Sequence, residues 1–410
     1  MSDALRIDRQ RLLGALAALA QIGKDPSGGV TRPAYSPADM EARRWVARRM
    51  DELGMRVTTD AAGNVCGRLG EGDRAILLGS HTDTVPRGGP LDGALGVLSA
   101  LECARVIREA GRRPSLPVEV VSFQDEEGRF KGLLGSRAFV GDLAPNEVAS
   151  ARDPAGVSLV EAMRGAGCDP DAATRVARPP GAYAAYVELH IEQGPRLETA
   201  RVPVGVVGTI VGIRRLQVSF EGLPDHAGTT PMTLRRDAFA AAMRFVSRAA
   251  ALMRWKGTAD TVWNVGVFHL APGVANIVPA RAEFILEFRD PEMGVLDRLE
   301  KELRAAASAV AEDQRTPAQV ARTLEVPPTP MDPAVRDAVS AGAAALGLAT
   351  LPLHSGGGHD AMMVARVAPA GMIFVPSVGG RSHCPEEDTH PEAIEAGANV
   401  LLHTVLRLAG

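Results

Sequence analysis

Histidine and carboxylate residues follow apolar segments of the chain at the points where those segments end. His81 and Asp83 come directly after the apolar segment 75–80, and Asp92 lies in the loop that follows. Imidazole and carboxylate groups suit a divalent metal ion, and a carboxylate two residues from a histidine can also fix its tautomer. A His-x-Asp pair alone is also common on surfaces and at helix caps, so both interpretations remain open here.

Three consecutive acids, 125–127, follow a second apolar segment, 118–123, within the motif Gln-Asp-Glu-Glu-Gly. Carboxylates this close repel one another, which raises their pKa values unless a cation or a proton relieves the repulsion. One glutamate can bind a metal ion while its neighbour takes a proton from water, as in metal-assisted hydrolysis. A solvated acidic loop is the alternative, and the position at a strand end disfavours it.

Two further histidines repeat this pattern, since His190 follows the apolar segment 184–189 and His383 comes soon after segment 372–375. In α/β sheets, functional groups gather at the carboxyl ends of the strands. The three histidines and the acids are therefore expected at one sheet edge. We expect no role for Cys384, because adjacent residues on an extended chain point to opposite sides.

The elements that must position these residues alternate between helical and strand patterns, which predicts an α/β fold. From about residue 207 the order becomes β-α-β-β-α-β, typical of a ferredoxin-like α+β domain. We predict a catalytic α/β/α metallohydrolase domain of residues 1–208 and 328–410, with an inserted domain of residues 209–327. The elements expected in the insert are strand 215–220, helix 235–253, strands 261–270 and 281–289, helix 294–312 and strand 319–326.

Composition excludes several classes of protein. The 410 residues carry a formal net charge of −4, so no broad cationic field exists for nucleic acid or an anionic membrane. The four cysteines are scattered without Cys-x-x-Cys spacing, which argues against a disulfide framework and favours the cytoplasm. The apolar segment 12–22 is too short to span a bilayer and lacks a cationic leader, so we expect an amphipathic helix there.

Seven motifs, in order along nearly the whole chain, resemble the M20 superfamily of metal amidohydrolases. Within it the chain is similar to the hydantoinase/carbamoylase branch, which includes N-carbamoyl-L-amino acid hydrolases, bacterial-type β-ureidopropionases and allantoate amidohydrolases. The motifs are GSHTDTVPRGGPLDGALGVLSALE, FQDEEG, ELHIEQGP, GLPDHAGTTPMTLRRDA, NIVPARAEFILEFRD, HSGGGHDA and PSVGGRSHCPEED. Two departures are a shorter segment 128–136 after the acids and SGGGHD where the family commonly has SGAGHD.

The resemblance implies two divalent metal ions per subunit, which could be Zn, Mn, Co or Ni. Asp92 would bridge both ions, with His81 and His190 completing one site and Glu127 and His383 the other. The general base would be Glu126, and Asp83 would orient the first histidine from behind. A histidine at position 190, where peptidase members usually carry a carboxylate, favours the carbamoylase branch.

The resemblance also implies substrate contacts from the inserted domain, which would act as a lid and as the surface of a homodimer, with one histidine possible at the neighbouring subunit's site. The expected contacts are His226 on the oxyanion, Arg289 on an α-carboxylate, Asn276, and from the catalytic domain Gln193, Gly357 and Gly358. Two of these residues keep structural alternatives: Asn276 as a turn residue and Arg289 as part of a sheet-edge salt bridge.

The implied reaction is hydrolysis of an N-carbamoyl-L-amino acid to the amino acid, ammonia and CO₂. Allantoate, ureidoglycolate and N-acyl-amino acids or peptides are the alternative substrates. A binding protein that had lost catalysis would lack the base or a ligand, whereas Glu126 and all five candidate ligands are present.

Overall fold

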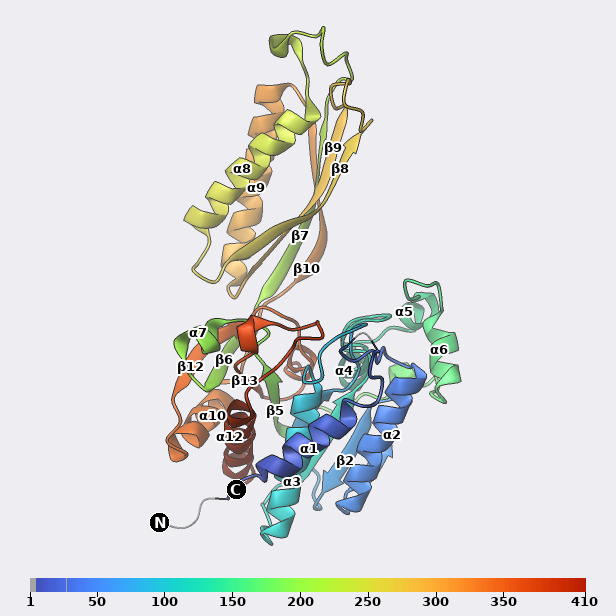
Figure 1. Cartoon of the computed structure of the whole chain (residues 1–410), viewed down its shortest axis with the longest axis vertical. Coiled ribbons are helices and arrows are strands. Elements are labelled where there is room, and N and C mark those ends of the chain that lie inside the picture. The colour runs from blue at the N-terminus through green and yellow to red at the C-terminus, as the bar shows by residue number, and fades with distance from the viewer. Residues whose placement is uncertain (1–4, 27) are drawn as a thin grey trace. The chain divides into compact units, whose positions relative to one another are not determined.

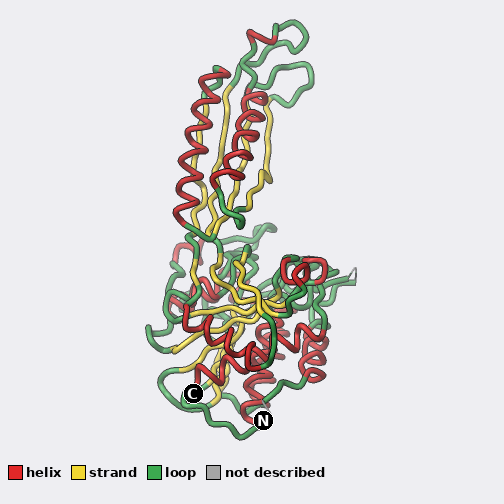
Figure 2. Tube along the Cα trace, turned by 90° about the vertical axis from the view of Figure 1, so that its left-hand side faces the viewer, coloured by secondary structure: helices red, strands yellow, loops and turns green. Residues whose placement is uncertain are grey.

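The computed structural model describes residues 5–26 and 28–410, and the chain divides into two compact units (Figure 1). The larger unit comprises Met1–Gly208 and Met331–Gly410, and the smaller unit is Thr209–Pro330. Both units combine helices and strands (Figure 2). The α/β class predicted from the sequence is confirmed.

The larger unit contains a nine-stranded mixed sheet in the order β1-β2-β4-β3-β5-β13-β6-β11, with β12 paired to β6. β3 is parallel to β4 and to β5, and β13 is parallel to β5, so the carboxyl ends of these four strands lie at one edge. The strands are β1 Arg56–Thr59, β2 Val65–Leu69, β3 Ala75–His81, β4 Val118–Phe123, β5 Tyr183–Ile191, β6 Val204–Ile210, β11 Thr329–Pro330, β12 Thr350–Ser355 and β13 Ala370–Val375.

Helices cover both faces of this sheet. Val120 of β4 belongs to the core cluster that includes α3, whereas Phe123 of the same strand contacts Phe139 of α4 at 5.3 Å between ring centres. Side chains three positions apart on a strand point to opposite faces, so α3 and α4 lie on opposite sides. The helices are α1 Arg9–Leu19, α2 Pro37–Glu52, α3 Ala94–Glu109, α4 Leu134–Val140, α5 Pro145–Ser150, α6 Leu159–Gly165, α7 Arg196–Ala200, α10 Pro333–Ala345, α11 Ala361–Val364 and α12 Pro391–Ala409.

The first helix starts earlier than the apolar segment 12–22 predicts. The Asp8 side chain accepts a hydrogen bond from the main-chain N–H of Arg11 at 3.0 Å and so caps a helix that runs over Arg9–Leu19. The helix ends before the apolar segment does. Among residues 5–26 and 28–410, every helix is too short or too polar to traverse a lipid bilayer.

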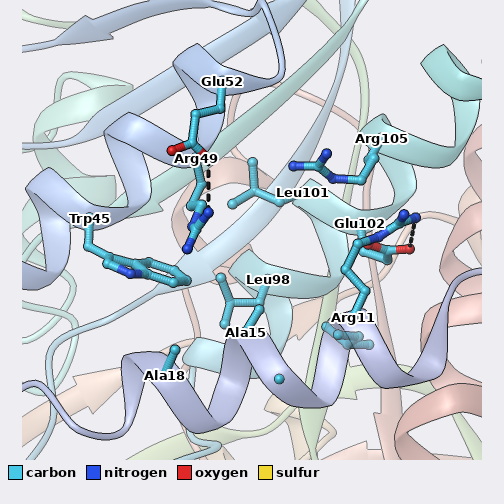
Figure 3. Close-up of a pocket in the computed structure, with 12 residues that line it drawn as sticks. Arg11, Ala15, Ala18, Trp45, Arg49, Glu52, Leu98, Leu101, Glu102 and Arg105 are labelled. Carbon is cyan, nitrogen blue, oxygen red and sulfur yellow. Dashed lines mark hydrogen bonds and ion pairs between the residues drawn. The ribbon is translucent and has the colours of Figure 1, made fainter.

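α1, α2 and α3 line a surface cavity of about 380 Å³ (Figure 3). Two ion pairs are among the lining residues: Arg11 with Glu102 at 2.7 Å, and Arg49 with Glu52 at 2.9 Å. Gly14 of α1 is among the lining residues, and a Cβ added there would meet no heavy atom within 4 Å. None of the residues lining this cavity is a predicted site residue.

The smaller unit is an antiparallel sheet in the order β10-β7-β9-β8, with α8 and α9 on one face (Figure 1). Alternate residues of β7 and β9 are buried against the helices, as a half-buried sheet requires. β8 is an edge strand and is exposed along nearly its whole length. The bounds are β7 Gly212–Glu221, α8 Ala238–Lys256, β8 Val262–Ala271, β9 Arg281–Asp290, α9 Met293–Gln314 and β10 Ala318–Val326.

The chain leaves and rejoins the larger unit at two adjacent strands. Ile210 of β6 pairs with Thr329 of β11, and Thr209 pairs with Pro330, in an antiparallel ladder. The two ends of the smaller unit are therefore side by side.

Candidate metal centre

The carboxyl edge of the parallel strands brings together five residues whose side chains can bind metal ions. His81 ends β3 and His190 lies one residue before the end of β5, while Glu127 follows β4 and His383 follows β13. Asp92 lies in the loop between β3 and α3. These residues form two groups of three, with Asp92 common to both.

The first group is fully buried and consists of His81, Asp92 and His190. The Nε2 atoms of His190 and His81 lie 3.0 and 3.7 Å from the same oxygen, Asp92 Oδ1. A Cβ at Gly93 would lie 2.4 Å from the His81 ring, and Gly93 has a φ of 64°, so the turn after Asp92 requires glycine. The backbone thus approaches the imidazole closely enough to fix its place.

The second group is Asp92, Glu127 and His383. Asp92 Oδ2 lies 3.0 Å from His383 Nε2, which in turn lies 3.4 Å from Glu127 Oε2. The His383 side chain is 50% exposed, so this group opens to solvent. Each oxygen of the Asp92 carboxylate therefore faces a different group, as a carboxylate between two cations must.

Electrostatics at the centre favour bound cations. Burial, together with the carboxylates of Asp360, Glu127 and Asp92, raises the pKa of Glu126 well above its usual value. Burial and the charge of Asp92 raise the pKa of Glu127 to about 8, and its Oε1 atom is buried without a hydrogen-bond partner. Several carboxylates therefore share this space. Oxygen and imidazole donors in this number fit a divalent metal ion.

The Asp92 carboxylate raises the pKa values of two histidines, His190 and His383. Burial lowers the pKa of His190, but the hydrogen bond to Asp92 and its charge outweigh this and raise the pKa to about 9. The hydrogen bond to Asp92 likewise raises the pKa of His383 to about 9. Burial by itself would raise the pKa of Asp92, and the bonds to both histidines hold it well below its usual value.

Glu126 borders the first group without belonging to it. Its Oε2 atom lies 3.5 Å from His81 Nε2, and its side chain is 10% exposed. The preceding residue, Asp125, has a φ of 52°, an uncommon left-handed conformation for a residue other than glycine. This turn separates the directions of the neighbouring acids, so that Glu126 faces the first group and Glu127 faces the second.

Asp83 contacts both the imidazole and the acidic loop. His81 Nδ1 lies 3.1 Å from the main-chain carbonyl of Asp83, whereas the Asp83 carboxylate lies 3.8 Å from the same nitrogen. That carboxylate accepts the main-chain N–H groups of Glu126 at 3.4 Å and Glu127 at 3.2 Å. Its main chain orients the imidazole, and its side chain fixes the acidic loop.

Gln193, predicted as a substrate contact, lies at the centre itself. Its Nε2 atom donates to Asp92 Oδ2 at 2.9 Å and lies 3.4 Å from His383 Nε2. A Cβ added at Gly357 would lie 3.2 Å from Gln193 Oε1, so this glycine borders the same side chain. Gly358 follows it, with Met362 Sδ 3.6 Å from a Cβ built there.

The other predicted substrate contacts belong to the smaller unit. His226 is exposed, and its Nδ1 accepts the N–H groups of Gly228 and Thr229 at 3.0 and 3.2 Å. Asn276 lies beside it, since its carbonyl accepts the N–H of Ala227 at 2.9 Å. The loop hydrogen bonds of the His226 ring are thus made by Nδ1 and not by Nε2.

Arg289 takes part in an ion pair on the sheet of the smaller unit. Its Nε and Nη2 atoms donate to Glu287 Oε1 at 3.0 and 2.7 Å, and Glu287 Oε2 accepts from Arg215 Nη2 at 2.6 Å. A salt bridge is therefore present, although it lies on the inner strand β9 and not at the sheet edge that the structural alternative expected. The Arg289 side chain nevertheless remains 31% exposed.

Sequence reasoning missed several residues of the centre. Glu188 and His359 form a buried group with His190, and the carboxylate of Glu387 accepts the main-chain N–H of Asp92. Glu188 had a signal, because residues two apart on a strand share a face and Glu188 precedes His190 by two. Glu387 also had a signal, since it lies four residues after His383 in the motif PSVGGRSHCPEED.

An α/β unit with this donor set at the carboxyl edge of its parallel strands defines a protein with a divalent-metal site. Comparisons with known proteins agree. The family described as Peptidase family M20/M25/M40 matches residues 77–407. The chain belongs to this family, and the resemblance noted in the sequence is confirmed.

Similar proteins place the chain among amidohydrolases. It is 43% identical to the N-carbamoyl-L-amino acid amidohydrolase of Geobacillus stearothermophilus over 98% of this chain and 99% of that protein. It is 36% identical to the allantoate amidohydrolase of Bacillus subtilis (strain 168), covering 95% of each. The crystal structure of an amidase of the hydantoinase/carbamoylase family from Burkholderia phymatum matches with a TM-score of 0.92 at 40% identity, covering 100% of this chain and 99% of that chain.

Proposed function

We propose that this protein hydrolyses the C–N bond of N-carbamoyl-L-amino acids and releases the amino acid, ammonia and CO₂. The observation that carries the proposal is the position of Asp92, whose two oxygens each face a separate group of metal-binding side chains. The similarity to N-carbamoyl-L-amino acid amidohydrolases over nearly the whole chain supports this substrate class.

Two divalent cations would be held at this centre. His81, His190 and one Asp92 oxygen would hold the first cation, and Glu127, His383 and the other Asp92 oxygen the second. Zn, Mn, Co and Ni all accept such nitrogen and oxygen ligands. When bound, the cations supply Lewis-acid activation of a water molecule and of the scissile carbonyl.

Glu126 would act as the general base. Its carboxylate borders the first group, 3.5 Å from His81, and is largely shielded from solvent, which suits a group that takes a proton from the attacking water. The same carboxyl then returns the proton to the leaving nitrogen, so that ammonia departs neutral. The carbamate left on the amino acid then loses CO₂, which breaks the remaining N–C bond of the carbamate and frees the amino group. Burial and the neighbouring carboxylates raise its pKa, so the charge of bound cations would be needed to keep this carboxyl ionised and able to take a proton.

The substrate would be held by residues of both units. Arg289 would bind the α-carboxylate through its planar guanidinium, with Glu287 fixing the orientation of the fork. His226 would stabilise the oxyanion, with Asn276 beside it. Gln193 and the glycines at 357 and 358 would contact the ureido group at the metal centre. The smaller unit would thus serve as a lid.

The smaller unit would also form a homodimer through β8. This edge strand leaves its outer hydrogen-bonding groups unpaired and exposes apolar side chains, which is unfavourable in a monomer. The exposed apolar residues of the strand are Val262, Trp263, Val267, Phe268 and Leu270. The four free cysteines are compatible with a reducing compartment, and we place the enzyme in the cytoplasm.

The decisive experiment measures ammonia release and, in parallel, release of free amino acid by protein reconstituted with Mn, Co or Zn. The substrates are N-carbamoyl-L-amino acids, their D-forms, allantoate, ureidoglycolate, acetyl amino acids and dipeptides. Release from an N-carbamoyl-L-amino acid, stopped by a chelator, is the expected result. Preference for allantoate, as the 36% identical relative suggests, would move the substrate within the ureido class. Cleavage of only acyl or peptide bonds would overturn the proposal.

A further inference from the structure

A buried arginine of α2 contacts the end of strand β4, just before the acidic loop. The Arg43 side chain is 2% exposed. Its Nη2 donates to the carbonyl of Phe123 at 2.6 Å, and its Nη1 donates to the carbonyls of Ser122 and Gly63 at 3.2 Å each. Ser122 and Phe123 are the last two residues of β4, so this guanidinium fixes the point where the strand ends.

Asp39, one turn earlier on α2, continues the contact into the loop. Its Oδ1 accepts from Arg43 Nε at 3.0 Å, and its Oδ2 accepts from the side-chain amide of Gln124 at 2.7 Å. Both side chains are buried, so the ion pair is shielded from water. The pair therefore holds three consecutive residues, 122–124, immediately before the acids.

The far side of the loop is linked to the same guanidinium through Asp83. Arg43 Nη2 lies 3.8 Å from Asp83 Oδ1, and the Asp83 carboxylate accepts the N–H groups of Glu126 and Glu127. Between these supports lies Asp125 with its left-handed φ of 52°. A conformation of this kind persists only where the surroundings hold it.

We propose that Arg43 and Asp39 are positioning residues that set the directions of Glu126 and Glu127. The inference rests on the proposed function, since it assigns those acids as base and ligand. A lysine at position 43 would keep the charge, but its single ammonium cannot reach a carboxylate and three carbonyls in one plane. The rate of hydrolysis would then fall, although the protein would keep its fold and the positive charge at position 43.

The test compares Arg43→Lys with Arg214→Lys. Arg214 lies in the smaller unit, is 1% exposed and pairs with Asp297 at 2.7 Å and with Glu300, so its replacement also disturbs a buried ion pair. We expect Arg43→Lys to lower kcat by about 10- to 100-fold, as observed for supports of metal ligands, with KM changed little. Arg214→Lys should lower the melting temperature and leave kcat unchanged.

A second readout requires no turnover. The visible absorption spectrum of the Co²⁺-loaded protein reports the geometry of the ligands, including Glu127. Arg43→Lys should alter this spectrum and Arg214→Lys should not. If the wild-type protein hydrolyses none of the substrates, the proposed function fails, and the spectrum still decides the positioning role.

Asp39→Asn keeps the test decisive if Arg43→Lys does not fold. It retains size while removing the charge that holds Gln124 and Arg43. The same loss of kcat and change of the Co²⁺ spectrum are expected. Folded variants of either residue with wild-type kcat and spectrum would overturn the proposal.

Discussion

Glu387 accepts the main-chain N–H of Asp92 at 3.0 Å across a separation of 295 residues. The same oxygen accepts the N–H of Leu91 at 2.9 Å, and its other oxygen accepts the hydroxyl of Ser382 at 2.7 Å. Ser382 precedes His383, so one buried carboxylate joins the loops that carry two candidate metal ligands. The two halves of the centre are thus fixed to each other before any cation binds.

Replacing Glu387 should weaken metal binding. Glu387→Gln removes the negative charge and leaves one acceptor oxygen for the N–H groups of Leu91 and Asp92, so the link through Ser382 is reversed or lost, which lowers metal affinity on the order of 10-fold. Glu386→Gln is the matched control, because Glu386 pairs with Arg381 on the surface. Competition with a fluorescent chelator measures both. Equal affinities in the two variants would show that Glu387 does not support Asp92.

Replacing Glu126 and replacing Glu127 by glutamine should impair the enzyme in different ways. Glu126→Gln should keep metal content and lower kcat by about 10²- to 10⁴-fold, because it removes a general base but no ligand. Glu127→Gln should lower the metal content, because Glu127 completes the second group. Elemental analysis with ammonia release separates the two results. A Glu126→Gln variant with full activity would remove that residue from the mechanism.

Substituting Arg289 should affect substrate binding more than chemistry. Arg289→Lys should raise KM for carboxylate substrates about 10-fold or more, since a hydrogen bond to a charged group contributes roughly 1.5–3 kcal/mol. Arg215→Lys is the control, because Arg215 binds the same Glu287 from the other side. Steady-state kinetics measures both. If the two variants raise KM equally, the ion pair rather than the carboxylate contact is responsible.

Metal binding should release protons near pH 7. In the metal-free protein the pKa values of His190 and His383 are raised to about 9 and that of Glu127 to about 8, so these groups carry protons at pH 7. A cation requires them deprotonated, so affinity falls as pH decreases below these values. Calorimetric titrations with Mn²⁺ in buffers of different ionisation enthalpy count the protons. A heat independent of the buffer would contradict the assignment of these ligands.

Two helical glycines should respond in opposite ways to alanine. Gly14→Ala should stabilise the protein by roughly 0.5–1 kcal/mol, because α1 loses a flexible residue and the added Cβ points into open space. Gly96→Ala should destabilise it by about 1–3 kcal/mol, because the Cβ would lie 2.5 Å from the carbonyl of Leu189. Thermal unfolding measures both changes. Destabilisation by Gly14→Ala would mean that α1 packs more tightly than the open cavity indicates.

The strand-end pattern explains why much of the site could be predicted. His81, His190 and the acids at 125–127 each lie at or just after a buried apolar segment, and parallel strands bring such positions together. Asp92 lies in a loop without periodicity, so its role came only from the resemblance. No residue spacing could show that its two oxygens would face different groups.

The residues that hold the site in place were harder to predict from the sequence. Arg43 lies in a helix rich in arginine, and a single arginine there looks like a surface residue. Its spacing held a signal, since Asp39, Arg43, Val46 and Met50 occupy the buried stripe of α2. Charged residues at i and i+4 on an apolar face predict a buried pair, but only tertiary contacts reveal which carbonyls they bind. Strands β1, β2, β6 and β12 were also missed because they are short or follow loops.

The pairing of β6 with β11 makes the smaller unit a modular insertion. Thr209 and Pro330 are neighbours in one antiparallel ladder. The backbone of the larger unit therefore needs only a hairpin-like junction to accommodate the insert. Loop-closure entropy grows only slowly with length, so a long insert here costs the host little more than a short turn would. The host sheet can therefore keep the carboxyl edge of its parallel strands unchanged while the insert diverges in sequence and length.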